Sequence, residues 1–598
     1  MRQVDWGVRH PTRQTVRRFL LVLLVLAAGF WVWLLARPLP LPLPLPEVTV
    51  SFNPYQQTLL ADYERLFRAE LRGDTGVLER FVRAAPDSYL RYRTLLKLAR
   101  NRAVSAKARL AYLEQVVAFG LISPLARDDV KRAQLELGRA AEEAGSTVRA
   151  AAAYGEALPL AAAAQGLERL ELKPSARARI FLDARDPERA LAALQGVAAP
   201  ELRAPALAAA GDFERALRVY SRLLKAQPED DEARQGKFSV LLSLERYRQA
   251  EALLNTLSDS QVARVQLAEA EGEPEAALAA YLELGDDRSL WLSAGLLEAR
   301  GEASAALPLY LQVSRGSSDY SDDAAFRAYT LASRGGDTVT ARAANALIPA
   351  DSFFGLLRGK SLPAFNGSLK RVTPPVLGLA RALVRSGDLE AALGELLVAL
   401  PQSRDEATTV ALAEALQDMG EFGSSSLAAS TYIQQGSRAR RTYEAAYPRA
   451  YTQTVRAQAR TYGEPPALLW AVMRQESHFY PRAVSRSGAQ GLLQLIPSTW
   501  DYVAELLDEP PADPFNPAAN IRYGAFYLSR LLTQFDGDLL ESIAAYNGGP
   551  GYIGRLLGEP VVTDAADFYR AITRDETREY IGRVMVNYAV YKELYGLE

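Results

Sequence analysis

The feature that most constrains the fold is a short pattern that recurs through the middle of the chain. Residues 51–437 are rich in Ala, Leu, Arg and Glu and contain few runs of β-branched residues, a composition that favours helices. In each copy of the pattern, an alanine follows a glycine by five residues and a larger side chain follows it by nine. The copies are Gly145-Ala150-Tyr154, Gly211-Ala216-Tyr220, Gly272-Ala277-Tyr281, Gly301-Ala306-Tyr310 and Gly387-Ala392-Leu396, with Glu245-Ala250-Leu254 as a variant that lacks the glycine. The sequence therefore predicts a mainly α-helical chain built on a repeated pair of helices.

Each residue of the pattern has its own role in packing. The glycine can end one helix at positive φ, the alanine lets the next helix approach closely, and the larger residue fills the groove. This unit resembles the tetratricopeptide helix–turn–helix repeat. The step from position 211 to 245 is 34 residues, the length of that repeat, but the next two steps are 27 and 29. We therefore expect a degenerate tetratricopeptide-like α-solenoid over residues 51–437, which serves as a scaffold or as a binding surface for envelope proteins.

The N-terminus carries the signals of an exported, membrane-anchored protein. Residues 19–36 are uncharged and mostly apolar, near the lower limit for a membrane-spanning helix, and residues 1–18 hold five arginines against the single Asp5. By the positive-inside rule, residues 1–18 form a cytoplasmic basic tail and the chain beyond the anchor lies on the outer, periplasmic or cell-wall side. The alternative is a signal peptide cleaved near the small residues Ala27–Gly29. The apolar run continues to Leu35, longer than a signal core needs, so we favour a retained single-pass anchor in the cytoplasmic membrane.

A spacer of regular composition follows the predicted anchor. Proline alternates with leucine from Pro38 to Pro46, within a segment that spans residues 37–50. Proline at every second position prevents a helix and favours polyproline II, which rises about 3.1 Å per residue. This segment is therefore predicted to hold the next domain about 28 Å away from the membrane.

Residues that are rare or absent exclude several kinds of chemistry. The chain contains no cysteine and only two histidines, His10 and His478. This excludes disulfides, iron–sulfur clusters, zinc ribbons and thiol nucleophiles, and a Ser-His-Asp triad would need one of the two histidines. The net charge of −2 argues against a protein that coats nucleic acid. We expect no metal, no cofactor and no nucleic-acid partner, and chemistry that rests on carboxylates, hydroxyls and amides.

The composition changes near residue 438, which predicts a compact domain over residues 438–598. Pro465-Pro466 precedes an apolar segment, and proline suits the first turn of a helix. The residues expected on one buried face of that helix are Leu468, Leu469, Val472, Met473 and Glu476. A glutamate at the end of a buried stripe has a raised pKa, because burial disfavours its charged form. Glu476 could therefore act as a general acid near neutral pH.

Four further motifs lie downstream of Glu476. Two glycines and an amide occur in the segment from Gly488 to Gln494, and Asn516-Pro517 predicts the N-cap of a helix that contains Asn520–Gly524. The segment Ala545–Gly549 presents Tyr546 and Asn547 at a Gly-Gly turn, and Glu576-Thr577-Arg578 with Tyr580 opens the last helix. Amides, phenols and one shielded acid are the groups that hold and protonate a sugar chain.

In this order, the motifs resemble those of the soluble lytic transglycosylase family. The resemblance is to the large members of that family, which combine a helical superhelix with a lysozyme-like α+β catalytic domain. Two departures concern small or apolar positions. Gly548 stands where the family usually has alanine, and Leu493 and Ile496 stand where methionine is common. We expect them to change the subsites rather than the activity.

The resemblance implies cleavage of the β-1,4 bond between N-acetylmuramic acid and N-acetylglucosamine in peptidoglycan, with formation of an anhydromuramoyl end. Glu476 would protonate the leaving oxygen and then, as carboxylate, take a proton from the muramoyl C6 hydroxyl. Ser485 and Gln494 would contact the muramoyl side, and Tyr546 would orient groups near the acid. The resemblance also implies that the groove is lined by Gly488, Gly491, Asn547, Glu576 and Tyr580.

Two other functions remain open from the sequence. A lysozyme-type hydrolase needs a second carboxylate, and the chain has no acidic residue between Glu476 and Asp501, although Asp501, Asp513 or Glu576 could fold close to it. A non-catalytic wall-binding scaffold is the other alternative. His478 would act as a metal ligand or a base, or would lie on the surface or at the rim of a cleft. We favour the rim, because no second histidine is near.

Overall fold

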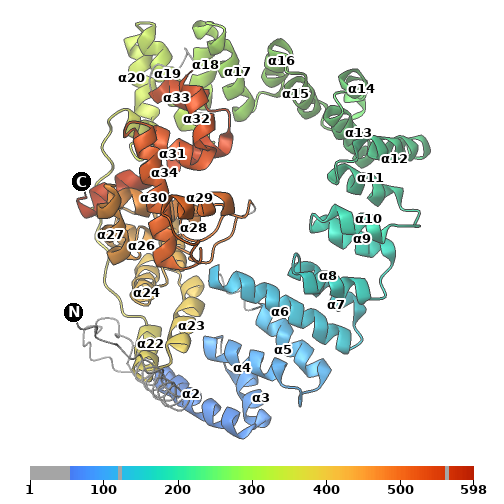
Figure 1. The fold of residues 1–598 in the computed structure, drawn as a ribbon, viewed down its shortest axis with the longest axis vertical. Coiled ribbons are helices and arrows are strands. Elements are labelled where there is room, and N and C mark those ends of the chain that lie inside the picture. The colour runs from blue at the N-terminus through green and yellow to red at the C-terminus, as the bar shows by residue number, and fades with distance from the viewer. Residues whose placement is uncertain (1–53, 86, 119–123, 486, 559–564, 598) are drawn as a thin grey trace, which may run out of the picture. The chain divides into compact units, whose positions relative to one another are not determined.

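A computed structural model describes residues 54–85, 87–118, 124–485, 487–558 and 565–597 (Figure 1). The chain divides between Phe52 and Asn53, so all of these residues belong to its second part. The predicted basic tail, membrane anchor and Pro-Leu spacer lie outside the described residues. Within the described residues, every helix is too short or too polar to cross a membrane. The boundaries of the domains therefore stay predictions.

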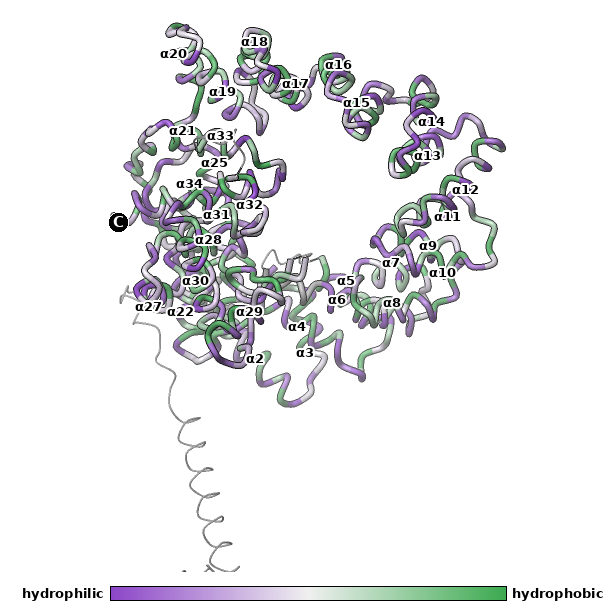
Figure 2. The backbone as a smooth tube through the Cα atoms, turned by 45° about the horizontal axis from the view of Figure 1, so that its top comes forward, coloured by the Kyte–Doolittle hydropathy of each residue, from purple (hydrophilic) through white to green (hydrophobic). Residues whose placement is uncertain are grey.

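The described part of the repeat region is mainly helical, with a long connection between α21 and α22. Its first helices are α2 (Pro54–Arg72), α3 (Thr75–Ala84), α4 (Tyr89–Arg100), α5 (Ala106–Ala118), α6 (Pro124–Glu143), α7 (Thr147–Ala157), α8 (Ala161–Arg169), α9 (Pro174–Asp183), α10 (Pro187–Ala193), α11 (Pro200–Ala209), α12 (Phe213–Ala226) and α13 (Asp231–Ser243). There follow α14 (Tyr247–Glu251), α15 (Ser260–Glu271), α16 (Pro274–Leu284), α17 (Asp287–Ala299), α18 (Ala303–Val313), α19 (Ser321–Arg334), α20 (Thr338–Leu347), α21 (Phe353–Leu357), α22 (Pro375–Arg385), α23 (Leu389–Ala399), α24 (Glu406–Asp418) and α25 (Gly423–Gln434). Bands of hydrophobic and hydrophilic residues alternate along these helices (Figure 2), as expected for helices with one buried face.

The predicted roles of the repeat pattern are confirmed. The five pattern glycines have positive φ: Gly145 (73°), Gly211 (79°), Gly272 (70°), Gly301 (80°) and Gly387 (86°). Glu245, which replaces the glycine in the variant copy, also has positive φ, at 57°. The pattern alanines are all buried, and the Tyr154 ring fills a groove against Gly138 and Gly166, where a Cβ would lie only 2.5 and 2.6 Å from it.

A tyrosine–glutamate hydrogen bond adds a feature that the sequence analysis missed. In three repeats, the pattern tyrosine donates its hydroxyl to a glutamate twelve residues earlier, which lies three residues before the pattern glycine. These bonds join Tyr154 to Glu142 (2.6 Å), Tyr281 to Glu269 (2.8 Å) and Tyr310 to Glu298 (3.0 Å). The hydrogen bond fastens the second helix of a repeat to the first across the turn.

The last helices of the array pack against the first ones. Helix α22 contacts α2, and α23 contacts α4, so segments about 300 residues apart in sequence share one hydrophobic core (Figure 1). The buried carboxyl of Glu395 accepts hydrogen bonds from the Tyr63 hydroxyl at 2.6 Å and from the Leu90 amide at 3.0 Å. Two distant ends of the array are thus joined by apolar packing and by one buried acid.

The C-terminal domain is also helical. Its helices are α26 (Arg440–Ala446), α27 (Thr452–Tyr462), α28 (Pro466–Ser477), α29 (Pro497–Leu506), α30 (Pro517–Gln534), α31 (Leu539–Gly548), α32 (Pro550–Leu557), α33 (Ala565–Ala571) and α34 (Asp575–Tyr595). The expected α+β character is wrong for the described residues of this domain. In place of strands they form isolated bridges, Val484–Gln490 and Gln490–Leu495 within the domain and Gly367–Ala439 to the repeat region. The positive-φ residues Gly488, Gly491 and Gln494 turn the chain every three residues, so no ladder can extend.

Helices α17 and α19 of the array contact α33 of the C-terminal domain through a buried charged cluster. Arg327 is buried and lies 3.0 Å from Asp323 and 3.6 Å from Glu298. Arg570 on α33 reaches the same Glu298 at 2.7 Å. Beside this cluster, the ring of Tyr569 lies 4.9 Å from that of Phe353. One repeat glutamate therefore also joins the array to the C-terminal domain.

Candidate active site

Helix α28 brings Glu476 to the centre of the C-terminal domain. Pro466 occupies the first turn of this helix, as predicted, and the helix packs against α27 and α34. All residues from Ala467 to Met473 are buried, so the helix is enclosed on every side rather than along the single stripe that the spacing predicted. The helix ends where His478 takes a left-handed conformation (φ 46°), which leaves Glu476 in the last turn, only partly buried.

The carboxyl of Glu476 is held in an environment that keeps its proton. Burial, with a smaller contribution from the negative charge of Glu576, raises the pKa of Glu476 to about 8. The Tyr580 hydroxyl donates a hydrogen bond of 2.6 Å to Oε1 and acts in the opposite direction, because it stabilises the charged form. The raised pKa that the sequence predicted is thus present, and Glu476 carries a proton at neutral pH.

Two phenols flank this carboxyl, the buried Tyr580 and the partly buried Tyr546. Burial and the charge of Glu476 hold the pKa of both Tyr546 and Tyr580 well above the ordinary range. Both hydroxyls therefore keep their protons, and Tyr546 donates its own to the carbonyl oxygen of Leu493 at 2.7 Å. Tyr546 thereby joins α31 to the glycine-rich loop, and Tyr580 joins α34 to the catalytic candidate.

The two glycines of the loop have different surroundings. Gly488 has positive φ (83°), and a Cβ there would meet no atom within 4 Å. At Gly491 a Cβ would lie 2.1 Å from Asn520 Nδ2, so the close approach at this glycine is to the protein itself and not to open groove. A side chain at position 491 is therefore excluded by Asn520, and the contact of Gly491 with a glycan stays a prediction.

Asn520 is the residue that holds this loop. Its fully buried side chain donates to the carbonyl oxygens of Gln490 (3.1 Å) and Pro514 (2.8 Å), and accepts from the Leu493 amide at 2.8 Å. The sequence pointed to Asn520 as part of a motif but gave it no role. As predicted, Asn516 caps the helix that carries it, by accepting from the amides of Ala518 and Ala519.

The side chains of Ser485 and Gln494 form hydrogen bonds within the glycine-rich loop itself. The Gln494 amide donates to the carbonyl oxygens of Gly491 (2.7 Å) and Ala483 (3.1 Å). The Ser485 hydroxyl accepts from the Ala489 amide at 3.0 Å and lies 2.8 Å from the Ser487 hydroxyl. The loop is thus braced from within, and the contact of both residues with a muramoyl group stays a prediction.

The start of α34 meets the turn after α31. Thr577 donates to Asn547 Oδ1 at 2.7 Å, and Arg574 donates to the Gly548 carbonyl at 2.8 Å. A Cβ at Gly548 would lie 3.1 Å from the buried Thr577, which explains why glycine suits this position in this chain. Glu576 is exposed in the first turn of α34, so the acid that acts on Glu476 faces solvent.

A second carboxyl of this domain, that of Glu464, is buried although the sequence did not predict it. The residue is 5% exposed, and within the described part of the chain neither carboxyl oxygen has a partner in hydrogen-bonding geometry. Burial raises its pKa to about 9, and its charge contributes to the raised pKa of Tyr546. The available signal was an acidic residue between Gly463 and Pro465, just before an apolar helix.

His478 lies closer to the protein interior than expected. The sequence favoured the surface or a cleft rim, whereas its Nδ1 is buried without a partner among the described residues and burial lowers its pKa to about 4. Its position in the left-handed turn after α28 draws the ring inward. The described residues include no cluster of acidic, histidine or cysteine side chains that could hold a metal ion.

Comparisons with known proteins give matches to both the repeat region and the C-terminal domain. Residues 453–565 match the family model of the transglycosylase SLT domain, and residues 207–271 match a tetratricopeptide repeat, which confirms the predicted repeat character there. The chain is 32% identical to the soluble lytic murein transglycosylase of Escherichia coli K12 over 158 residues, which are 26% of this chain and 24% of that protein. It is also 32% identical to a putative soluble lytic murein transglycosylase of Haemophilus influenzae over 155 residues, 25% of this chain and 26% of that protein. The matched region thus spans about a quarter of the length of these curated relatives.

Solved structures extend the likeness of the fold. The crystal structure of the 70 kDa soluble lytic transglycosylase from Escherichia coli superposes with a TM-score of 0.59 at 18% identity, and the match covers 90% of this chain and 96% of that one. The complex of the 70 kDa soluble lytic transglycosylase with bulgecin A gives the same TM-score and identity over 91% and 97%. At this level of identity the likeness shows a shared fold from the array to the C-terminal domain.

Proposed function

We propose that this chain is a peptidoglycan lytic transglycosylase of the soluble lytic murein type. The observation that carries the proposal is the carboxyl of Glu476, with a pKa of about 8 and a 2.6 Å hydrogen bond from Tyr580. It lies within the region that matches the transglycosylase SLT domain. A single protonated carboxyl that can also serve as a base is what an intramolecular cleavage needs.

In the proposed reaction, Glu476 gives its proton to the oxygen that leaves with N-acetylglucosamine, and the bond from that oxygen to the muramoyl C1 breaks. The resulting carboxylate takes the proton of the muramoyl C6 hydroxyl, whose oxygen bonds to C1 and closes the anhydro ring. Glu476 ends protonated again, and no water is consumed. Burial favours the acid form that begins the reaction, and the Tyr580 hydrogen bond stabilises the carboxylate form in the middle of it.

We also propose that the groove around Glu476 binds the glycan strand. Ser485 and Gln494 would meet the muramoyl side of it, through lone pairs and protons that the loop does not use. Asn547 and Glu576 would line the groove at the turn between α31 and α34. Alanine substitution at Ser485 or Asn547 is expected to raise KM more than it lowers kcat, measured with soluble glycan strands.

Hydrolysis is the second candidate, and one observation favours it. The charge of Glu576 acts on Glu476, so a second carboxylate does lie within electrostatic range, whereas Asp501 and Asp513 do not contribute to that pKa. A hydrolase would use such a group as nucleophile or base at about 5 to 9.5 Å from the acid. A non-catalytic scaffold is not favoured, since it would have no need of a protonated, partly exposed carboxyl.

Mass spectrometry of digested peptidoglycan distinguishes these functions. A lytic transglycosylase yields anhydromuramoyl ends, and a hydrolase yields reducing muramic acid. We expect anhydromuramoyl products from the wild type and from Glu576→Gln, and no product from Glu476→Gln. Reducing ends as the main product, or reducing ends lost in Glu576→Gln, would establish hydrolysis instead.

For its location, we propose a chain anchored in the cytoplasmic membrane by residues 19–36, with the array and the C-terminal domain outside. The support is the apolar run, the arginines of residues 1–18 and the Pro-Leu spacer. The array would present a surface to envelope proteins. Membrane fractionation followed by N-terminal sequencing of the purified protein tests this proposal, since cleavage of a signal peptide would leave a soluble chain that begins near residue 30.

A further inference from the structure

Helix α34 connects the candidate active site with the array. On one face of this helix, Tyr580 donates its hydroxyl to Glu476 at 2.6 Å. On another face, the guanidinium of Arg578 lies 5.1 Å from the centre of the Trp291 ring, which belongs to α17 of the array. Positions two apart in a helix project to nearly opposite sides of it. A movement of α34 that releases Arg578 from the array therefore also moves Tyr580.

Trp291 is held firmly within the array. It is buried, and its Nε1 donates a hydrogen bond of 2.9 Å to Asp323. The guanidinium of Arg327, which pairs with the same Asp323, lies 5.7 Å from the centre of the ring. An aromatic ring attracts a cation over its face, and the attraction is stronger where water is excluded. The array therefore presents a fixed indole ring to Arg578, whose side chain is only 17% exposed.

A second contact holds the segment that precedes α34. Arg570 of α33 reaches Glu298 of α17 at 2.7 Å. Four residues further on, Arg574 donates to the carbonyl oxygen of Gly548 at 2.8 Å, at the turn after α31. The array thus contacts the chain at residues 570 and 578, on both sides of the point where this segment meets the active-site turn.

The repeat of Glu298 differs from the neighbouring repeat of the array. In that neighbour, the equivalent Glu269 accepts from its pattern tyrosine and lies 3.3 Å from Arg288, another residue of the array. Glu298 also accepts from its pattern tyrosine and lies 3.6 Å from Arg327 of the array, but it has Arg570 of the C-terminal domain as a further partner. A structural contact of the repeat is thus extended into the domain that carries the acid.

We propose that Trp291 and Glu298 are positioning residues of the reaction, and that they hold α34 where Tyr580 reaches Glu476. This inference rests on the proposed function and adds two residues of the array to those on which turnover depends. The Tyr580 hydrogen bond stabilises the carboxylate form of Glu476, and a hydrogen bond weakens steeply as its geometry is lost. Misplacement of a group by about 1 Å can cost about a hundredfold in rate, so a small displacement of α34 is enough to slow the chemistry.

The same displacement changes the pKa of Glu476 in a defined direction. Tyr580 and Glu576 of α34 and Tyr546 of α31 are the titratable groups that face this carboxyl from the helices around it. Moving Tyr580 away raises the pKa, and moving Glu576 away lowers it, but the effect of Tyr580 is the larger of the two. We therefore expect a net rise in the pKa of Glu476 when α34 loses its contacts with the array.

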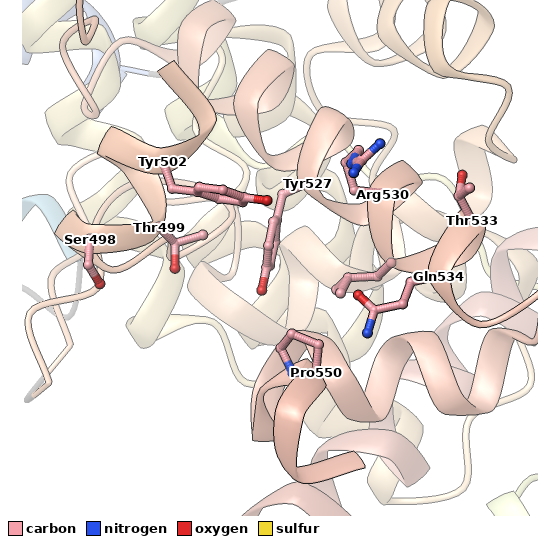
Figure 3. Close-up of a pocket in the computed structure, with 9 residues that line it drawn as sticks. Ser498, Thr499, Tyr502, Tyr527, Arg530, Thr533, Gln534 and Pro550 are labelled. Atoms are coloured by element: carbon pink, nitrogen blue, oxygen red, sulfur yellow. The ribbon is translucent and has the colours of Figure 1, made fainter. Parts of the chain in front are cut away.

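Binding of the glycan is expected to change less than turnover. A pocket of about 470 Å³ lies next to the site, between α29, α30 and the start of α32 (Figure 3). The ring of Tyr527 in its lining is 5.6 Å from the ring of Tyr546. The described lining of this pocket includes no residue of α33 or α34. A displacement of α34 therefore leaves this surface beside Glu476 intact, and we expect kcat to fall with little change in KM.

The test assays full-length variants on soluble glycan strands. Trp291→Leu removes the indole ring, and we expect kcat to fall about tenfold while KM stays within about threefold. Trp291→Phe keeps an aromatic face for Arg578 and is expected to recover part of the loss. Glu298→Gln is expected to lower kcat about fivefold. Its matched control is Glu269→Gln in the neighbouring repeat, which is expected to leave kcat within twofold of the wild type.

Two further measurements show whether the effect passes through Tyr580. In a Tyr580→Phe background, Trp291→Leu is expected to lower kcat by less than about twofold, because the hydrogen bond that it disturbs is already absent. The second measurement needs no turnover. The infrared band of the protonated Glu476 carboxyl is expected to persist to higher pH in Trp291→Leu than in the wild type.

The opposite results overturn the inference. These are a full tenfold loss in the Tyr580→Phe background, an unchanged titration of Glu476 in Trp291→Leu, or a loss of activity equal to the unfolded fraction seen by circular dichroism. If Trp291→Leu does not fold, Arg570→Gln takes its place with the same expected results, since the Arg570 side chain is 32% exposed and its loss leaves Arg327 beside Glu298. Absence of anhydromuramoyl ends with the wild type would instead overturn the proposed function, and the infrared titration would still test the positioning.

Discussion

The array and the candidate active site both contain a tyrosine that donates a hydrogen bond to a glutamate, but the two glutamates differ in protonation and in role. In the array, the Tyr154 hydroxyl donates to Glu142, and Arg169 lies 3.1 Å from the same carboxylate. The hydrogen bond from Arg169, and to a smaller extent that from Tyr154, lowers the pKa of Glu142, so this glutamate is charged and has a structural role. In the active site, the Tyr580 hydroxyl donates to Glu476, but burial outweighs this bond and raises the pKa to about 8. The tyrosine–glutamate pair of the array has an arginine beside it, so its glutamate stays charged and serves as a structural contact. The pair in the active site is buried without a neighbouring cation in the described part of the chain, so its glutamate keeps a proton that it can donate.

Glu395 refines this comparison. It also accepts from a tyrosine, and burial raises its pKa, but it is 4% exposed in the core between α23 and α2. A raised pKa is thus not enough for catalysis. Glu476 differs from Glu395 because it lies in the last turn of its helix and is only partly buried.

The largest effect is expected from Glu476→Gln. The amide keeps the size of the side chain and can still accept from Tyr580, but it cannot give or take the proton. We expect the formation of anhydromuramoyl ends to fall at least about a thousandfold with an unchanged circular dichroism spectrum. Glu142→Gln, the matched change in the array, is expected to leave turnover within twofold. Comparable loss of turnover in both variants would contradict the distinction between a structural Glu142 and a catalytic Glu476.

The next effect concerns stability and Glu464. Its pKa of about 9 in the folded chain exceeds the ordinary 4.5, so the folded chain keeps a proton that the unfolded chain has lost at neutral pH. Stability is therefore full below about pH 4.5 and falls as the pH rises to about 9. Glu464→Leu removes this dependence and is expected to stabilise the domain by about 3 kcal/mol at pH 7.

Urea denaturation at pH 5 and pH 8 measures this effect. The wild type is expected to lose more stability between the two pH values than Glu464→Leu does. Equal losses would mean that Glu464 is already charged in the folded chain. Glu476 contributes equally to both proteins, so the difference between them isolates Glu464.

A smaller effect is expected from Tyr580→Phe. Loss of the hydrogen bond removes the group that lowers the pKa of Glu476, so the pKa rises and the carboxylate form is less stable. We expect turnover to fall about tenfold, and the alkaline limb of the pH–rate profile, set by loss of the Glu476 proton, to move to higher pH. A limb that stays in place, or that moves to lower pH, would show that Tyr580 does not act on this carboxyl.

The smallest effect is expected from Tyr154→Phe in the array. The bond that it removes is partly exposed and joins two helices of one repeat. We expect a loss of about 1 kcal/mol in the free energy of unfolding and unchanged turnover. A change in turnover without a change in stability would show that the array reaches the chemistry through this repeat.

The sequence predicted the features that depend on a few neighbouring residues. The positive φ of Gly211, the burial of Ala216 and the start of α28 at Pro466 all follow from local sterics. The contacts that it could not predict join distant residues, since Tyr580 lies 104 residues from Glu476 and Tyr63 lies 332 residues from Glu395. Local spacing carries no information on such partners.

The wrong expectations have the same origin. The stripe predicted for α28 rested on its own periodicity, but α27 and α34 cover the rest of the helix. Nothing near Gly491 in sequence indicated that Asn520 occupies the space where a Cβ of residue 491 would lie. Glu464 was missed because its burial is created by the packing of the domain and not by its neighbours in sequence.

The most direct test of the account is the protonation state of Glu476 itself. The infrared difference spectrum between wild type and Glu476→Gln isolates this carboxyl and can be recorded from pH 5 to pH 9. We expect the band of a protonated carboxylic acid at pH 6 to 7, replaced by carboxylate bands as the pH passes through about 8. A carboxylate spectrum already at pH 6 would contradict the assignment of Glu476 as the proton donor.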